Sequence, residues 1–216
     1  MNDTSLDLMK QMKFFGMHDA FRSSMEGGRM ESFTIDELIG LLVQAEWDDR
    51  QNRKTERLIR NASFRYKAAI EQLDFDAKRG LDKNQIMRFA QCDFIRKRQN
   101  LLITGSTGIG KSFIASAIGH QGCMLGYKVI YSNTAKLFRK LKMAKADGSY
   151  IKQINRIERQ DLLILDDFGM QPLDNQNRLA LMELIEDRHT QRSTIITSQL
   201  PVKQWYDIIG EKTIAD

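Results

Sequence analysis

The residues best suited to chemistry lie in one glycine-rich stretch, residues 105–112, which reads GSTGIGKS. Its glycines allow tight turns and let backbone N–H groups approach an anion without a Cβ in the way. At this spacing Lys111 would reach the β- and γ-phosphates of a nucleotide, and the Ser112 hydroxyl would ligate Mg²⁺. The stretch therefore predicts a phosphate-binding loop for ATP or ADP, with contacts from Gly105, Ser106, Thr107, Gly108, Ile109, Gly110, Lys111, Ser112 and Phe113.

The flanking sequence supplies the elements that such a loop needs. The apolar run at residues 101–103 is typical of a buried parallel strand. Residues 113–121 are expected to form the helix that follows, whose N-terminus would direct further N–H groups at the phosphates. Without this context, the motif could be a chance match within a glycine-rich turn.

A second apolar run, residues 162–165, ends in two carboxylates, Asp166 and Asp167. Parallel strands deliver their last residues to the edge where α/β folds bind ligands, so the pair predicts a Walker B site. Asp166 would hold Mg²⁺ through a water molecule or together with Ser112. Asp167 would orient and deprotonate the attacking water. Either carboxylate alone could belong to an ordinary turn, but with the loop they predict a Mg²⁺-dependent ATPase.

A further strand is expected near the end of the chain, at residues 193–199, and it ends in polar side chains. A polar group at that edge can touch the γ-phosphate or position the attacking water. Ser198 and Gln199 are therefore additional catalytic candidates.

The whole chain has 216 residues and a formal net charge of +5, enough for one α/β domain with a small extra module. Its two cysteines, Cys92 and Cys123, stand in no metal-binding or redox spacing and are expected to be buried thiols in a reducing compartment. The sequence shows neither a signal peptide nor an apolar run of about 18 residues. We therefore expect a soluble, cytoplasmic protein with no membrane partner.

The order of the predicted elements divides the chain. Residues 1–72 show helical patterns and no strand pattern, including a capping box in which Thr34 begins a long helix and Glu37 follows three residues later. Residues 73–216 carry the predicted strands. We therefore expect an α/β fold, in which a P-loop core with a parallel sheet flanked by helices follows a small all-helical N-terminal domain.

Positive charge is concentrated in two segments. Residues 50–67 contain seven basic residues and one acidic residue, Glu56, and residues 136–159 contain eight basic residues and two acidic ones. Such faces suit phosphate contacts, although a charged run on a helix is often only a solvated surface. The sequence predicts contact with double-stranded DNA through Arg50, Arg53, Lys54, Arg57, Arg60, Lys136, Arg139, Lys140 and Lys142.

Three stretches give the chain a resemblance to a known family over almost its whole length: residues 46–54 (EWDDRQNRK), residues 165–169 (LDDFG) and residues 194–201 (TIITSQLP). The chain resembles the IstB-like transposition helper ATPases, AAA+ proteins of bacterial insertion sequences that are related to DnaC-type helicase loaders. The resemblance implies an AAA+ core, homo-oligomers that assemble with ATP on duplex DNA and remodel it, and presentation of that DNA to a cognate transposase. It also implies that Ser198 or Gln199 serves as the sensor 1 residue.

Two features depart from the family pattern. Asp167 stands where most AAA+ proteins carry Glu, and the shorter side chain predicts slow hydrolysis. Residues 210–216 resemble only the start of the segment that leads to the arginine finger and sensor 2 in relatives, so the core is expected to lack its C-terminal end and neither residue is assigned.

Two other functions fit parts of the sequence. A helicase loader or adaptor of the DnaC type would use the N-terminal helices to grip a helicase, with DNA contact secondary. A nucleotide kinase would need an arginine-rich lid after the core, and no such lid is evident in the sequence.

Overall fold

The structure is a computed structural model that describes residues 2–28, 32–76 and 80–210. The chain divides into two compact units, Met1–Arg57 and Leu58–Asp216. This division falls within the long helix α3 (Ile35–Ala62), earlier than the boundary after residue 72 that the sequence suggests. In the part of the chain that is described, no helix is both long and apolar enough to cross a lipid bilayer.

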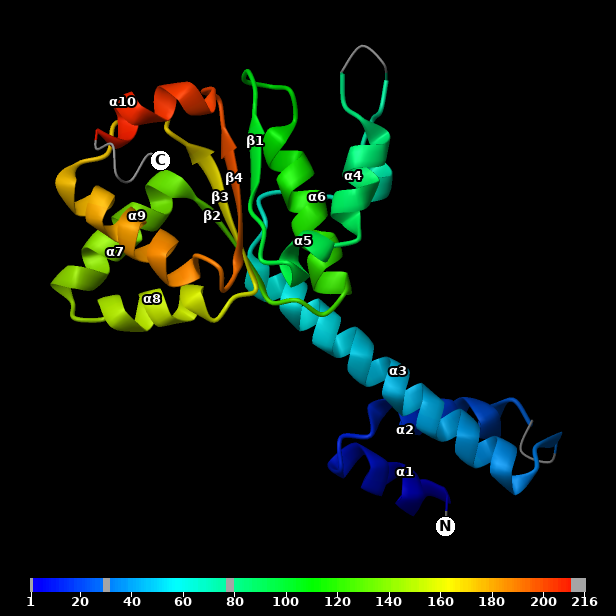
Figure 1. The fold of residues 1–216 in the computed structure, drawn as a ribbon. Coiled ribbons are helices and arrows are strands. Elements are labelled where there is room, and N and C mark those ends of the chain that lie inside the picture. The colour runs from blue at the N-terminus through cyan, green and yellow to red at the C-terminus, as the bar shows by residue number, and fades with distance from the viewer. Residues whose placement is uncertain (1, 29–31, 77–79, 211–216) are drawn as a thin grey trace. The chain divides into compact units, whose positions relative to one another are not determined.

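The first unit is helical, as expected, and contains α1 (Asn2–Gln11), α2 (Phe15–Glu26) and most of α3 (Figure 1). The capping box at the start of α3 is confirmed: the Thr34 N–H donates to Glu37 Oε2 at 2.8 Å, and the Glu37 N–H donates to Thr34 Oγ1 at 3.3 Å. Glu46 fastens α2 to α3, because its buried carboxylate accepts hydrogen bonds from the N–H groups of Gly16 and Met17 at the first turn of α2.

The second unit is built on a parallel sheet. The described strands are β1 (Leu101–Thr104), β2 (Val129–Asn133), β3 (Leu162–Phe168) and β4 (Ser193–Ser198), and they lie side by side in the order β1-β4-β3-β2. β3 is central and almost entirely buried. Its side chains alternate between the two faces of the sheet: Leu162 and Ile164 join one hydrophobic cluster, and Leu163 and Leu165 join the other. The parallel sheet predicted from the sequence is confirmed.

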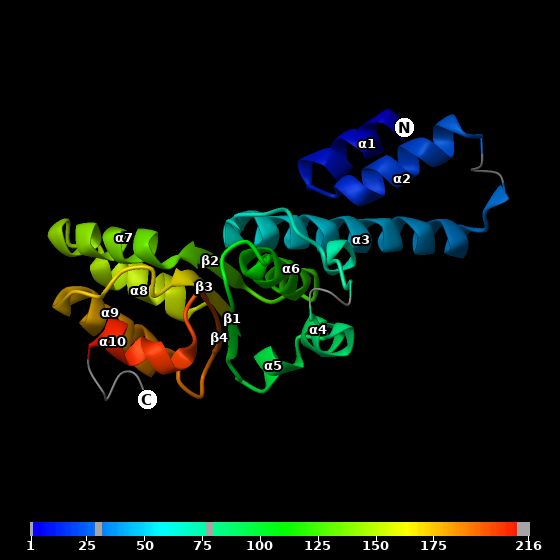
Figure 2. The same cartoon turned by 90° about the horizontal axis from the view of Figure 1, so that it is seen from above.

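Helices cover both faces of this sheet (Figure 2). One face packs against α6 (Lys111–Met124), together with the 3₁₀ turn Ile70–Gln72 and the helices α4 (Lys83–Ala90) and α5 (Asp93–Arg96). The other face packs against α7 (Thr134–Ala146), α8 (Tyr150–Glu158), α9 (Asn175–Arg188) and α10 (Trp205–Ile209), with the 3₁₀ turn Val202–Gln204 before α10. Gly119 allows α6 to lie close to the sheet, because a Cβ there would meet Ile164 Cδ1 at 2.6 Å and Phe64 Cε1 at 2.7 Å.

Candidate functional site

The glycine-rich loop joins β1 to α6, as the sequence predicts. Gly110 lies directly before α6 with φ of 93°, a left-handed conformation that favours glycine. Lys111 is the first residue of α6 and is 7% exposed, and its ammonium donates a 2.7 Å hydrogen bond to the Ser106 carbonyl. The loop thus holds a buried cation at a helix N-terminus, an arrangement suited to an anion.

The two carboxylates both reach the site because β3 is irregular where they occur. In a regular strand, consecutive side chains point to opposite faces. The β3–β4 pairing shifts register between Leu165 and Phe168, and Asp167 takes a left-handed φ of 56°. This bulge turns Asp167 toward the same edge as Asp166.

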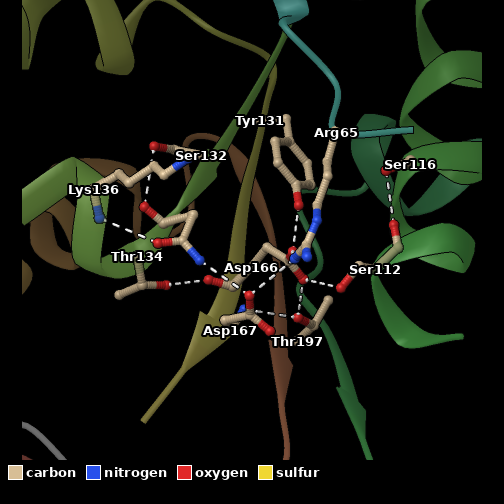
Figure 3. A network of polar contacts seen from close by, with 11 residues as sticks. Arg65, Ser112, Ser116, Tyr131, Ser132, Thr134, Lys136, Asp166, Asp167 and Thr197 are labelled. Atoms are coloured by element: carbon tan, nitrogen blue, oxygen red, sulfur yellow. Dashed lines mark hydrogen bonds and ion pairs between the residues drawn. The ribbon is translucent and has the colours of Figure 1, made fainter. Parts of the chain in front are cut away.

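Asp166 is completely buried and fully hydrogen-bonded (Figure 3). Its Oδ1 accepts from Ser112 Oγ at 2.7 Å and from Thr197 Oγ1 at 2.5 Å. Its Oδ2 accepts from the Tyr131 hydroxyl and lies 3.7 Å from Arg65 Nη1. Burial, followed by this bond to Asp166, raises the pKa of Tyr131 far above its ordinary value, so the phenol stays protonated and donates. These donors satisfy both oxygens of the buried side chain without exposure to water.

Asp167 is more accessible and contacts three other elements (Figure 3). Its Oδ2 accepts from Arg65 Nη1 at 3.2 Å and from Asn133 Nδ2 at 3.0 Å, and its N–H donates to Thr197 Oγ1 at 3.1 Å. Thr197 therefore links the two carboxylates through one hydroxyl.

The loop and Asp167 line one cavity of about 560 Å³, and the buried Asp166 is hydrogen-bonded to Ser112 in its wall. Its walls are Arg65, Tyr66, Thr107, Gly108, Gly110, Lys111, Ser112, Phe113, Asp167, Met170 and Gln199. Ser112 Oγ and the carboxylate of Asp166 offer the hard oxygen ligands that Mg²⁺ prefers, next to the loop that would hold the phosphates. The residues present therefore fit a nucleotide with its metal. Among the described residues, no cluster of three or more His, Cys, Asp or Glu side chains forms a separate metal site.

The two candidates at the end of β4 differ in their surroundings. Gln199 lines the cavity, where its Oε1 accepts from Thr107 Oγ1 at 2.7 Å. Ser198 is buried, and its hydroxyl donates to the Phe168 carbonyl and accepts from the Leu200 N–H. Thr197, which the sequence analysis passed over, is the β4 residue that contacts a carboxylate of the site.

Residues 7–216 match the family of IstB-like ATP-binding proteins. The chain belongs to this family. It is 41% identical over 212 residues to an insertion sequence ATP-binding protein of Sinorhizobium fredii, covering 98% of this chain and 86% of that protein. It is 40% identical over 202 residues to an insertion sequence ATP-binding protein of Pseudomonas fluorescens, covering 93% and 87% respectively.

Solved structures share the fold of this IstB-like chain. A crystal structure of the DnaC helicase loader aligns with a TM-score of 0.59 at 20% identity, covering 69% of this chain and 90% of that one. The AMPPCP-bound DnaA structure from Aquifex aeolicus aligns with a TM-score of 0.62 at 19% identity, covering 71% and 48% respectively. These similarities confirm the AAA+ P-loop core.

The first basic segment of this IstB-like protein carries less free charge than its sequence suggests. Arg50 Nε lies 2.6 Å from Glu46 Oε1, and Arg53 Nη2 lies 2.6 Å from Asp49 Oδ2. A count that starts at residue 50 omits both acidic partners. Burial opposes ionisation of Glu46, but hydrogen bonds from Arg50 and from the N–H groups of α2 outweigh it and lower the pKa of Glu46. Arg50 and Arg53 therefore form part of the helical packing.

The same unit contains a cavity of about 410 Å³ that is lined by Met12, Lys13, Arg50, Arg53, Lys54 and Arg57. Lys54 and Arg57 are exposed on α3, and Lys13 comes from the turn between α1 and α2. Lys13 is a new candidate for contact with DNA, because only the fold places it beside Lys54 and Arg57. Arg60, the remaining predicted residue of the segment, is exposed near the end of α3 in the second unit.

The second basic segment forms α7 and α8, divided at residues 147–149. Leu137, Phe138 and Leu141 of α7 are buried against the sheet. The exposed face of α7 presents Lys136, Arg139, Lys140 and Lys142.

The first residues of α7 contact the nucleotide site directly. The Asn133 side chain accepts from the Lys136 N–H and donates to Asp167. Thr134 Oγ1 donates to the Asp166 carbonyl (Figure 3). Asn133 therefore caps the basic helix and contacts a carboxylate with the same amide group.

Sequence reasoning missed four residues that surround the carboxylates: Arg65, Tyr131, Asn133 and Thr197. Tyr131 and Asn133 lie at the end of β2, and their polar side chains at that edge of the sheet were an available signal. Arg65 had no local signal, because it lies 102 residues before Asp167 in the chain.

Aromatic residues also line the cavity. Tyr66 and Phe113 lie there with their ring centroids 6.0 Å apart.

Proposed function

We propose that this IstB-like protein is an ATP-dependent DNA-binding helper of transposition. In this account ATP and Mg²⁺ occupy the cavity at the loop, and copies of the protein assemble on duplex DNA in the ATP-bound state. The assembly remodels the DNA and presents it to a partner transposase. Hydrolysis to ADP releases it.

The single observation that carries this proposal is the contact between the basic helix and the two carboxylates. Asn133 and Thr134, at the beginning of α7, bond to Asp167 and Asp166, while the exposed face of the same helix carries the four cations predicted to contact DNA. A polyanion bound on α7 can therefore act on the residues that contact the metal and the attacking water, and the bound nucleotide can act on the helix in return.

The roles of the site residues follow from their positions. The loop N–H groups and Lys111 would hold the phosphates, displacing the bond from Lys111 to Ser106. Ser112 and Asp166 would hold Mg²⁺, which supplies charge neutralisation to the phosphates when bound. Gln199 and Thr107, joined at the cavity wall, are placed to contact the γ-phosphate.

Asp167 is the group placed to act on water. It would accept a proton as the water oxygen bonds to the γ-phosphorus and the bond from that phosphorus to the ADP oxygen breaks. Thr197 and Asn133 would fix its position. Because Asp167 is one methylene shorter than Glu, we expect hydrolysis to be slow.

The DNA contacts are proposed from cations that form no ion pair with another side chain among the residues that the structure describes. In the first unit these are Lys13, Lys54 and Arg57, and in the second unit Arg60 with the four cations of α7. Contacts of this kind bind phosphates with little sequence preference and weaken steeply with salt.

The proposal is tested by duplex DNA binding in the ATP-bound state across a salt series. The double charge reversal Lys54→Glu with Arg57→Glu should weaken binding to every duplex and reduce the slope of log affinity against log salt by roughly 2. The matched control is Lys10→Glu with Arg22→Glu, which changes the net charge equally on exposed residues of the same unit outside the basic cavity. If the two double variants weakened DNA binding equally, only net charge would matter, and Lys54 and Arg57 would not be DNA contacts.

A further inference from the structure

The Arg65 guanidinium occupies an unusual position in the nucleotide cavity. It lies 3.2 Å from Asp167 Oδ2 and 3.7 Å from Asp166 Oδ2, and it also lies over the Tyr66 ring at 5.3 Å. Its positive charge therefore lies beside the same two carboxylates that a metal ion would need. No assignment of the site made from the sequence includes this residue.

The backbone around Arg65 is anchored on both sides. Ala62 and Ala68 are buried in the cluster beneath α6, and Phe64 packs against Tyr131 with the ring centroids 6.4 Å apart. Ser63 turns the chain at the end of α3 with a left-handed φ of 57°. The Arg65 backbone is therefore held beside the cavity, while its half-exposed side chain can change rotamer.

Binding of a metal would change the balance of charge at this point. A divalent cation and a guanidinium repel each other when they share two carboxylates, so Mg²⁺ at Asp166 weakens the hold of the pair on Arg65. The nucleotide brings new anionic oxygens into the same cavity. Since the two carboxylates would lie at the metal-binding end of a nucleotide held by the loop, Arg65 would lie near the terminal phosphate.

We propose that Arg65 is a nucleotide-contacting residue that exchanges the Asp166–Asp167 pair for the γ-phosphate of ATP when the metal and nucleotide bind. Arg65 contacts the nucleotide bound to its own chain. It distinguishes ATP from ADP, because ADP lacks the γ-phosphate that the guanidinium would contact. Arg65 follows the end of α3 by three residues, so this contact would also link the end of α3 to the terminal phosphate. This inference rests on the proposed nucleotide and metal site.

The test is the ratio of the affinities for a non-hydrolysable ATP analogue and for ADP, both measured with Mg²⁺ by calorimetry. Arg65→Gln should weaken binding of the ATP analogue by roughly tenfold, the effect expected for losing one charge-assisted hydrogen bond at a half-exposed site. It should change ADP affinity by less than about twofold. Arg65→Lys should recover part of the loss, because it keeps the charge but not the planar fork.

Arg96→Gln is the matched control, because Arg96 also forms an exposed ion pair within the second unit, with Asp93 at 3.0 Å, away from the cavity. It should leave both affinities unchanged. An unaltered ATP-to-ADP ratio in Arg65→Gln, with both nucleotides still bound, would overturn the inference and leave the proposed nucleotide site intact. Failure of the wild-type protein to bind either nucleotide would instead contradict the proposed function on which the inference rests.

Discussion

Thr197 Oγ1 donates a 2.5 Å hydrogen bond to Asp166 Oδ1 and accepts one from the Asp167 N–H at 3.1 Å. One hydroxyl on β4 thus holds the side chain of the first carboxylate and the backbone of the second. It stands where the β3–β4 pairing is irregular, so it stabilises the bulge that brings both carboxylates to the site.

Thr197→Val should therefore impair hydrolysis more than nucleotide binding. The substitution keeps the shape and removes the hydroxyl, which leaves the Asp167 N–H without its acceptor and releases one constraint on Asp166. We expect ATP affinity within about threefold of wild type and a hydrolysis rate lower by at least roughly tenfold, since misplaced catalytic groups are costly. Single-turnover rates and equilibrium binding measure the two effects.

Thr197→Ser is the control, because it retains the hydroxyl and should keep most of the activity. Equal loss of rate in Thr197→Ser and Thr197→Val would mean that the methyl group, and not the hydrogen bonds, supports the site.

Asp167→Asn should separate binding from hydrolysis. The amide is nearly isosteric but accepts no proton from water, so we expect ATP binding to persist and the hydrolysis rate to fall by roughly a hundredfold or more. Because release depends on hydrolysis, the variant should also remain on DNA longer after free ATP is removed. Phosphate release and DNA dissociation are the measurements, and hydrolysis at the wild-type rate would assign the base to another residue.

Arg188 gives a prediction about stability. It ends α9, is 3% exposed, and donates hydrogen bonds to the carbonyls of Ile157, Gln160 and Ser193 and to Thr194 Oγ1. Burial lowers its pKa to about 10. These bonds join α8, α9 and β4 at the edge of the sheet opposite the nucleotide site, so Arg188 is a packing residue.

Arg188→Leu should lower the free energy of unfolding by at least about 2 kcal/mol, because it leaves several buried acceptors unpaired. Arg192→Leu removes an exposed ion pair with Asp161 and should cost less than about 1 kcal/mol. Denaturant unfolding of both variants provides the comparison. Similar losses in the two would contradict the role assigned to Arg188.

Sequence reasoning located the parts of this fold that depend on neighbouring residues. The cap at Thr34 accepts a hydrogen bond from the helix that it begins, and short-range side-chain chemistry suffices to predict it. The loop and the two carboxylates were recognisable for the same reason, since each follows a run of strand residues.

Long-range relationships were not accessible in the same way. Neither the bulge at Asp167 nor the approach of Arg65 from 102 residues away leaves a local pattern. The charge of α3 was overestimated because Glu46 and Asp49 precede the basic run and neutralise Arg50 and Arg53. In each case the missing information was which segments the fold brings together.

The central claim is that ATP at the loop controls assembly on DNA, and the most direct measurement is light scattering with random duplex DNA. The wild-type protein should form large DNA-bound assemblies with Mg²⁺ and a slowly hydrolysed ATP analogue, and markedly smaller ones with ADP. Lys111→Ala should form none with either nucleotide, because the loop loses the cation that holds the phosphates. Assemblies of the same size with ADP, or in Lys111→Ala with the ATP analogue, would contradict the account.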